Sequence, residues 1–156
     1  MTGAPRAPTK TAAKKTAAAV VAKPPGQARP PRSAAWVPER QDVIWIDCNP
    51  QAGGEMRDLH PMLVLSPGLF NARTGLVIGL PMTTAAYNAG NPFALAAGPA
   101  ELAFGGKAGK TSFVLCHQPK SFDWHARDAR PHAQGRVDDP VFAQACAVLN
   151  QIIGIG

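Results

Sequence analysis

The segment Gly105–Thr111 has a composition that could bind phosphate. A phosphate-binding loop needs four residues between its two glycines, so that enough backbone N–H groups surround the anion, and this segment has three. Phe104 stands where the first glycine should be, and the β-branched and aromatic run Ser112–Cys116 follows in place of a helix. We therefore interpret the segment as a turn rich in glycine and lysine.

The cysteines do not form a recognisable site either. Cys48, Cys116 and Cys146 have no CxxC spacing, and no cysteines and histidines stand at zinc-finger spacing. We expect reduced thiols in a cytoplasmic protein, with no metal and no cofactor. No run approaches the roughly 18 apolar residues that a membrane span requires, so we expect no membrane partner.

The basic charge of the chain belongs to its first 35 residues. Of the 16 basic and 10 acidic residues, seven basic and no acidic ones lie in residues 1–35, which leaves nine basic against ten acidic residues in the remainder. Residues 1–35 are also rich in alanine and proline, which predicts a disordered tail that attracts phosphate or nucleic acid. We expect one folded domain over residues 36–156, whose overall charge does not argue for binding nucleic acid.

The folded part reads as a series of short strands followed by one helix. Apolar and β-branched runs separated by turn residues are typical of a small antiparallel barrel. In the last segment, apolar residues recur at helical spacing after Asp139 as N-cap and Pro140 as first helical residue, and Gly154 ends the helix. A loop is expected at Asn49–Leu59. The expected strands are Asp42–Asp47, Met62–Ser66, Leu76–Met82, Phe93–Ala97, Ser112–Cys116, Ser121–Trp124 and Gly135–Val137.

Fragments spread over residues 36–156 together resemble the MazF/PemK family of toxins. Each fragment alone is weak, but their order and their spacing make the resemblance specific. The fragments are Val37-Pro38, Gln41–Asp47, Asn49-Pro50, Gly53–Glu55, His60–Pro67, Leu80–Thr84, Asn91–Phe93 and Gln118–Ser121 with Trp124.

The resemblance implies both a fold and a function. The fold would be mainly β (α+β), a small SH3-like antiparallel barrel of the PemK/CcdB type with a C-terminal helix. The function would be that of the toxin of a toxin–antitoxin system, a homodimer that cuts single-stranded RNA such as mRNA at specific sequences without a metal ion. A cognate antitoxin would neutralise it.

Metal-free RNA cleavage uses the ribose 2′-OH as nucleophile, and it needs a base, an acid and groups that stabilise the charged phosphorane. In the family this work falls on an arginine before the proline of the second strand and on a threonine at the end of the third. Thr84 matches the threonine, but His60 stands where the arginine would be. Histidine can give or take a proton near neutral pH, whereas arginine supplies a permanent charge, which Arg57 could replace here.

Two further residues are candidates for catalysis. His117 lies where some family members carry an aspartate, and it could share acid and base roles with His60 if the two side chains met. It could equally be a strand-end histidine without a catalytic part. Glu55 matches a family acid in the loop after the first strand, where it could orient the 2′-OH, hold a cation or merely be solvated.

Four residues are candidates for binding RNA without taking part in the chemistry. Lys120 is expected to contact a phosphate, which would make binding depend on salt and not on sequence. Gln118 and Ser121, which lie in the same family fragment, and Thr83, which precedes Thr84, are expected to contact the RNA as well. The full set is Lys120, Gln118, Ser121 and Thr83.

Two other functions stay open at this stage. A toxin of the same fold that poisons DNA gyrase, the CcdB type, uses an aromatic C-terminal tail, whereas this chain has no tryptophan after Trp124. A barrel that lost catalysis when the arginine became His60 would be a binding or regulatory module. The retained Thr84 and Glu55 argue against that module.

Overall fold

The computed structural model describes residues 36–99 and 109–155. The expected tail and most of the segment Gly105–Thr111 therefore lie outside the described residues. The elements follow in the order β1 (Asp42–Asp47), β2 (Leu59–Val64), α1 (Gly68–Thr74), β3 (Leu76–Thr83), η1 (Ala86–Gly90), β4 (Ala94–Pro99), β5 (Thr111–Leu115), β6 (Lys120–Asp123), β7 (Arg130–Arg136) and α2 (Asp139–Ile153).

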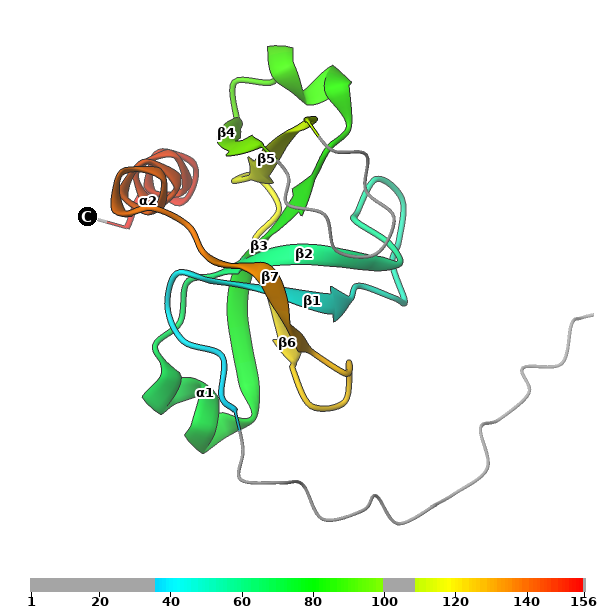
Figure 1. Cartoon of the computed structure of the whole chain (residues 1–156), viewed down its shortest axis with the longest axis vertical. Helices are drawn as coiled ribbons and strands as arrows, with labels where there is room; N and C mark the ends of the chain where they lie inside the picture. Colours follow the sequence, from blue (N-terminus) through cyan, green and yellow to red (C-terminus); the bar gives the residue numbers. More distant parts are fainter. Residues whose placement is uncertain (1–35, 100–108, 156) are drawn as a thin grey trace, which may run out of the picture. The chain divides into compact units, whose positions relative to one another are not determined.

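The strands form one curled antiparallel sheet in the order β4-β5-β3-β2-β1-β7 (Figure 1). β3 is its organising strand, because β2 pairs with one edge and both β5 and β6 pair with the other. The turn between β5 and β6 therefore lies beside the middle of β3. This mainly β fold with a C-terminal helix confirms the predicted fold class.

The centre of the sheet is buried on both faces, so β2 ends in an uninterrupted run of apolar residues. Met62, Leu63 and Val64 of β2 are all fully buried. Leu63 packs in a first core with α2, whereas Met62 and Val64 pack in a second core on the opposite face. Residues that alternate between two faces in this way identify the face on which any strand residue lies.

Among the expected strands, only β1 has the predicted boundaries. β3, β4, β5 and β6 differ by one or two residues at one or both ends, whereas the differences at β2 and α2 affect the argument. β2 begins at Leu59, because Leu59 pairs with Asp47 at the end of β1, and this start places His60 inside a strand. α2 has Asp138, not Asp139, as its N-cap, so Pro140 is the second helical residue, where its missing N–H costs nothing. The helix ends at Gly154 as predicted, in the left-handed conformation that glycine adopts readily.

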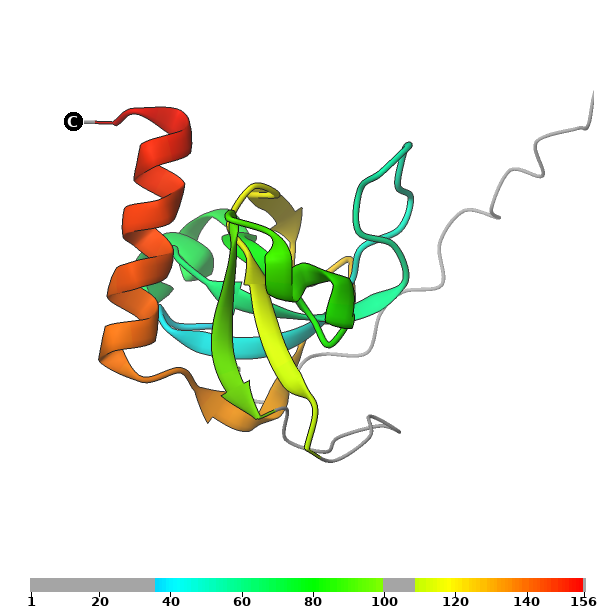
Figure 2. The same ribbon diagram turned by 90° about the horizontal axis from the view of Figure 1, so that it is seen from above.

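Three segments differ more from the expectation. β7 covers Arg130–Arg136, where only Gly135–Val137 was expected, and α1 and η1 were not expected at all. In both views α2 and the β1–β2 loop lie at opposite ends of the sheet (Figure 2). In the described part of the chain, no helix is long and apolar enough to span a membrane.

Candidate active site

His60 lies on the face of the sheet that carries the second core. It precedes Met62 by two residues and therefore shares its face. Its partner in the β1–β2 register is Ile46, another member of the second core. The side chain is half-buried, so one part of the ring packs on the sheet and the rest can meet a ligand.

The ring of His60 is oriented by a backbone carbonyl of β3. Its Nδ1 lies 3.3 Å from the carbonyl oxygen of Met82. Because a carbonyl oxygen only accepts hydrogen bonds, this contact requires the proton on Nδ1, and Nε2 of the neutral ring then keeps its lone pair. The ring is thus held in the tautomer that a general base at Nε2 requires.

This contact brings His60 to the end of β3, where both candidate threonines lie. Met82 points into the first core, so Thr83 points to the opposite face, which is the face of His60. Oγ1 of Thr83 accepts a hydrogen bond from the N–H of Ala85 at 3.2 Å, and its O–H can donate to a ligand. Thr84 follows the strand directly and is half-buried.

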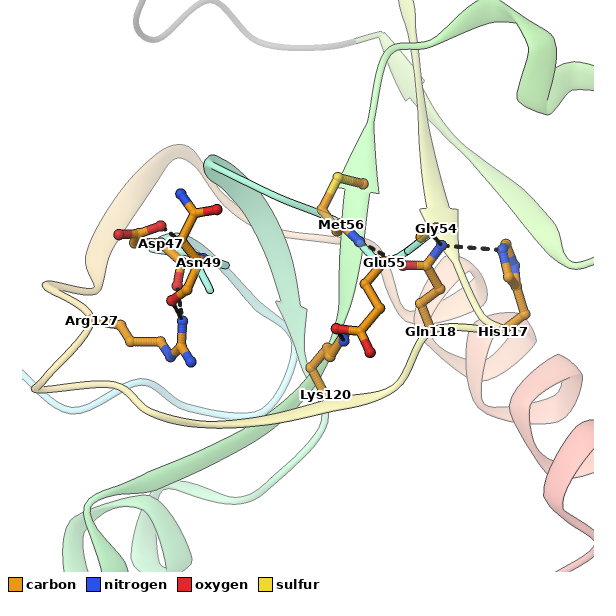
Figure 3. A network of polar contacts seen from close by, with 9 residues as sticks. All are labelled: Asp47, Asn49, Gly54, Glu55, Met56, His117, Gln118, Lys120 and Arg127. Carbon is orange, nitrogen blue, oxygen red and sulfur yellow. Dashed lines mark hydrogen bonds and ion pairs between the residues drawn. The ribbon is translucent and has the colours of Figure 1, made fainter. Parts of the chain in front are cut away.

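The β1–β2 loop folds over this face and is held by the β5–β6 turn (Figure 3). Nζ of Lys120 lies 2.5 Å from Oε2 of Glu55. Oε1 of Gln118 accepts a hydrogen bond from the N–H of Met56 at 3.0 Å, and its Nε2 donates to the carbonyl of Gly54 at 3.5 Å. Met56 also packs against the second core, so the tip of the loop lies over the face that carries His60.

Lys120 stabilises the ionised form of Glu55. Its hydrogen bond and positive charge lower the pKa of the Glu55 carboxyl below the ordinary value of 4.5, and partial burial opposes this effect. Glu55 is therefore a carboxylate at neutral pH. It can hold the ammonium group or accept a hydrogen bond from a hydroxyl group, but it cannot supply a proton.

The ion pair should stabilise the fold only where Glu55 is ionised. Because folding lowers the pKa of this carboxyl, the contribution is present above the unfolded value of about 4.5 and is lost as the pH falls through the folded value. We expect Lys120→Met to lower the urea midpoint at pH 7 and to have a smaller effect at pH 3. Lys110→Met, at an exposed position, is the control. An equal effect of Lys120→Met at both pH values would contradict this assignment.

The structure gives the other candidates different neighbours. The ring of His117 lies 6.3 Å from that of Phe93, and its Nε2 is 3.5 Å from Nε2 of Gln118. Nε of Arg57 lies 3.9 Å from the carboxylate of Asp58, and both side chains are exposed. The described contacts therefore join Glu55, Gln118 and Lys120 into one group and place His60 beside the threonines. The remaining candidate, Ser121, is exposed on β6 and pairs with Ile78.

Arg127 supports the site, although the sequence analysis did not select it. Its Nη1 donates to the carbonyl oxygens of Asp47 and Asn49 (Figure 3). Its guanidinium lies 4.2 Å above the ring of Phe122. These contacts tie the start of the β1–β2 loop to β6. No local signal could have identified Arg127, because its partners Asp47 and Asn49 are 80 and 78 residues away in sequence.

Among the residues that the structure describes, no three His, Cys, Asp or Glu side chains are grouped to hold a metal ion.

Comparison with known proteins shows the same resemblance over the whole described domain. Residues 39–153 match the model of the PemK-like, MazF-like toxins of type II toxin–antitoxin systems. The endoribonuclease toxin MazF of Escherichia coli K12 is 33% identical over 119 residues, which cover 76% of this chain and 96% of that protein.

Solved structures give the same result for the fold. The crystal structure of MazF from Deinococcus radiodurans is 32% identical, with a TM-score of 0.66, and the match covers 78% of this chain and all of the other. A MazE–MazF crystal structure from the same organism is 28% identical, with a TM-score of 0.60 and the same coverage.

Proposed function

The chain belongs to the PemK-like, MazF-like toxins of type II toxin–antitoxin systems, and from this membership we propose that it cleaves single-stranded RNA without a metal ion. Relatives that are named endoribonucleases support RNA as the substrate. The observation that carries the proposal is the contact of His60 with the carbonyl of Met82, because it leaves Nε2 as the proton acceptor of a ring held at the end of β3, on the face of Thr83.

The proposed reaction is an attack of the ribose 2′-OH on the adjacent phosphorus. The bond from 2′-O to phosphorus forms, and the bond from phosphorus to the 5′-oxygen breaks. A base takes the proton of the 2′-OH, and an acid returns a proton to the departing 5′-oxygen. The products are a 2′,3′-cyclic phosphate and a 5′-hydroxyl end, so no water and no metal enter the balance.

We assign these roles from the positions of the side chains. Nε2 of His60 accepts the proton of the 2′-OH, and a threonine hydroxyl donates to a phosphate oxygen. Lys120 adds positive charge near the phosphorane, and Glu55 holds its ammonium group in place. His117 is the candidate acid for the 5′-oxygen, a role that requires the bound RNA to bridge the distance from His60.

The same family membership supports a protein partner. A cognate antitoxin is expected of a type II system, and a solved relative was crystallised as a MazE–MazF complex. We propose that this chain acts in the cytoplasm as a homodimer that a MazE-like antitoxin inhibits. We further propose that the chain cleaves RNA only at particular short sequences.

The test is cleavage of a long single-stranded RNA by the purified full-length protein in excess EDTA. We expect 5′-hydroxyl and cyclic-phosphate ends at a small set of sequences, and a loss of roughly 10²-fold in rate when the donating threonine hydroxyl is removed. Comparing Thr83→Val with Thr84→Val identifies that threonine, because the family match selects Thr84 whereas the face of His60 selects Thr83.

Two results would contradict the proposal. Cleavage that stops in EDTA and returns with a divalent cation would show that the reaction needs a metal ion. RNA binding without cleavage, by folded protein free of antitoxin, would favour the binding module in which the change to His60 removed catalysis.

A further inference from the structure

A pocket of about 450 Å³ lies at the end of β1 and β2, on the face opposite His60. Such a volume falls within the range of small-molecule sites, about 300–1,000 Å³. None of the roles assigned above uses it. The residues that line it are Trp45, Asp47, Asn49, Asp58, Leu59, Arg127, Asp128 and Arg130.

The walls of this pocket combine a flat aromatic surface with charged groups of both signs. Trp45 offers its indole, whose ring lies 4.8 Å from that of His132, and Leu59 adds an apolar edge that is 51% exposed. Carboxylates provide hydrogen-bond acceptors and guanidinium groups provide donors. A planar ligand with both donors and acceptors on its rim fits such a pocket better than a phosphate or an apolar group does.

The ion pairs at the rim are weak enough for a ligand to replace them. Arg130 and Asp128 are 4.0 Å apart, and their side chains are 67% and 75% exposed. The lining residue Asp58 lies 3.9 Å from its neighbour Arg57, which is outside the lining, and their side chains are 73% and 72% exposed, respectively. Exposed pairs at such distances contribute little to stability, so a ligand can take over their hydrogen-bonding groups at small cost.

We propose that this pocket binds a guanine base of the RNA. Guanine presents two adjacent donors, N1–H and the N2 amino group, which one carboxylate can accept together. The other bases offer no such pair, because uracil has one N–H between two carbonyls and adenine and cytosine have an amino group beside an acceptor. Its O6 and N7 are the acceptors that arginine recognises, and its ring would stack on Trp45.

The position of the pocket relates it to the proposed cleavage site. Leu59 precedes His60 on β2, so the pocket and the proposed general base His60 lie on opposite faces at the same end of the strand. The loop between β1 and β2 contributes Asn49 and Asp58 to the pocket and Glu55 to the catalytic face. RNA that passes around this strand end would place the guanine within a few nucleotides of the cleaved bond. This inference rests on the proposed RNA cleavage.

Asp58 is the residue that best tests the guanine. Its Oδ1 accepts from Nδ2 of Asn49 at 3.2 Å, and its N–H donates to Oδ1 of Asn49 at 3.2 Å. Asp58→Asn keeps the size and the acceptor oxygen, and asparagine tolerates the φ of 64° at this position. Asp139→Asn on α2 is the control, with the same change of charge outside the pocket.

The first measurement is a titration of the full-length protein with 5′-GMP, 5′-IMP, 5′-AMP, 5′-CMP and 5′-UMP, followed by the NMR resonance of the Trp45 indole N–H. Trp45→Phe assigns that resonance. We expect 5′-GMP to bind most tightly and 5′-IMP, which lacks the N2 amino group, more weakly. Asp58→Asn should weaken 5′-GMP by about tenfold and remove its advantage over 5′-IMP, whereas Asp139→Asn should change neither. Equal binding of all five nucleotides, or no effect of Asp58→Asn, would overturn the inference.

The second measurement separates this inference from the proposed function. Cleavage sites mapped on a random RNA pool should show a guanine at one fixed position, and Asp58→Asn should relax that preference. Cleavage without a guanine preference would overturn the pocket's role and leave the nuclease in place. Binding of 5′-GMP without any cleavage would support the pocket and reject the nuclease. If the antitoxin shifts the Trp45 indole resonance and none of the nucleotides does, the pocket binds a peptide and the inference is overturned.

Discussion

Replacing His60 by alanine should lower the rate of RNA cleavage by about 10²- to 10⁴-fold, the usual contribution of a general acid or base. The loss should come from kcat, because the imidazole acts on the proton of the 2′-OH during the reaction and contributes little to RNA binding. Near-UV circular dichroism of the variant checks that the fold is kept, and kcat is measured with a fluorogenic oligoribonucleotide that contains the mapped site.

His60→Arg separates proton transfer from positive charge. A neutral histidine accepts a proton, whereas arginine supplies a permanent positive charge and does not act as a base. His60→Arg restores the family residue, and we expect it to cleave faster than His60→Ala but more slowly than the natural protein. A rate of His60→Arg equal to that of the natural protein would show that position 60 contributes positive charge and not proton transfer.

His117→Ala supplies the matched comparison at a second histidine. If His117 gives a proton to the 5′-oxygen, its loss should lower kcat as the loss of His60 does. If the ring only packs beside Phe93, kcat should stay close to that of the natural protein. The two variants thus show whether one or both histidines take part in the reaction.

β1 and α2 were predictable because their local patterns agree with their burial. Asp42–Asp47 has the predicted boundaries, and its apolar residues are shared between the two cores as a strand buried on both faces requires. The helix Asp139–Ile153 has an apolar stripe at helical spacing that packs against the first core. In both elements the sequence pattern and the tertiary packing favour the same conformation.

Other parts depend on contacts that no local pattern records. α1 has only seven residues and no side-chain hydrogen bond at its N-cap, so neither its length nor a capping residue predicts it from the sequence. The group of Glu55, Gln118 and Lys120 was selected by family resemblance, but its contacts join residues 62 to 65 positions apart. Whether Thr83 or Thr84 meets the ligand depends on the face of β3, which only the pairing with β2 and β5 defines.

Asn71 holds the unforeseen helix α1, and replacing it by leucine should lower the free energy of unfolding by about 3 kcal/mol. Its side chain is 0% exposed. Nδ2 donates to the carbonyl oxygens of Pro38 at 2.7 Å and Ser66 at 3.3 Å, and Oδ1 accepts from the hydroxyl of Ser66 at 2.5 Å. Leucine has a similar size but removes the donor to the carbonyl oxygens of Pro38 and Ser66, and each buried group left unsatisfied costs about 1–3 kcal/mol.

Thermal unfolding by calorimetry checks this prediction, with an expected fall in Tm of roughly 10 °C. Asn150→Leu makes the same chemical change at an exposed position of α2 and should shift the free energy by less than about 0.5 kcal/mol. An unchanged Tm for Asn71→Leu would show that the three hydrogen bonds are dispensable. α1 adjoins the start of β3, whereas the threonines lie at its end. At 20 °C the folded variant should therefore keep the kcat of the natural protein, which separates the stability of the sheet from the chemistry that it positions.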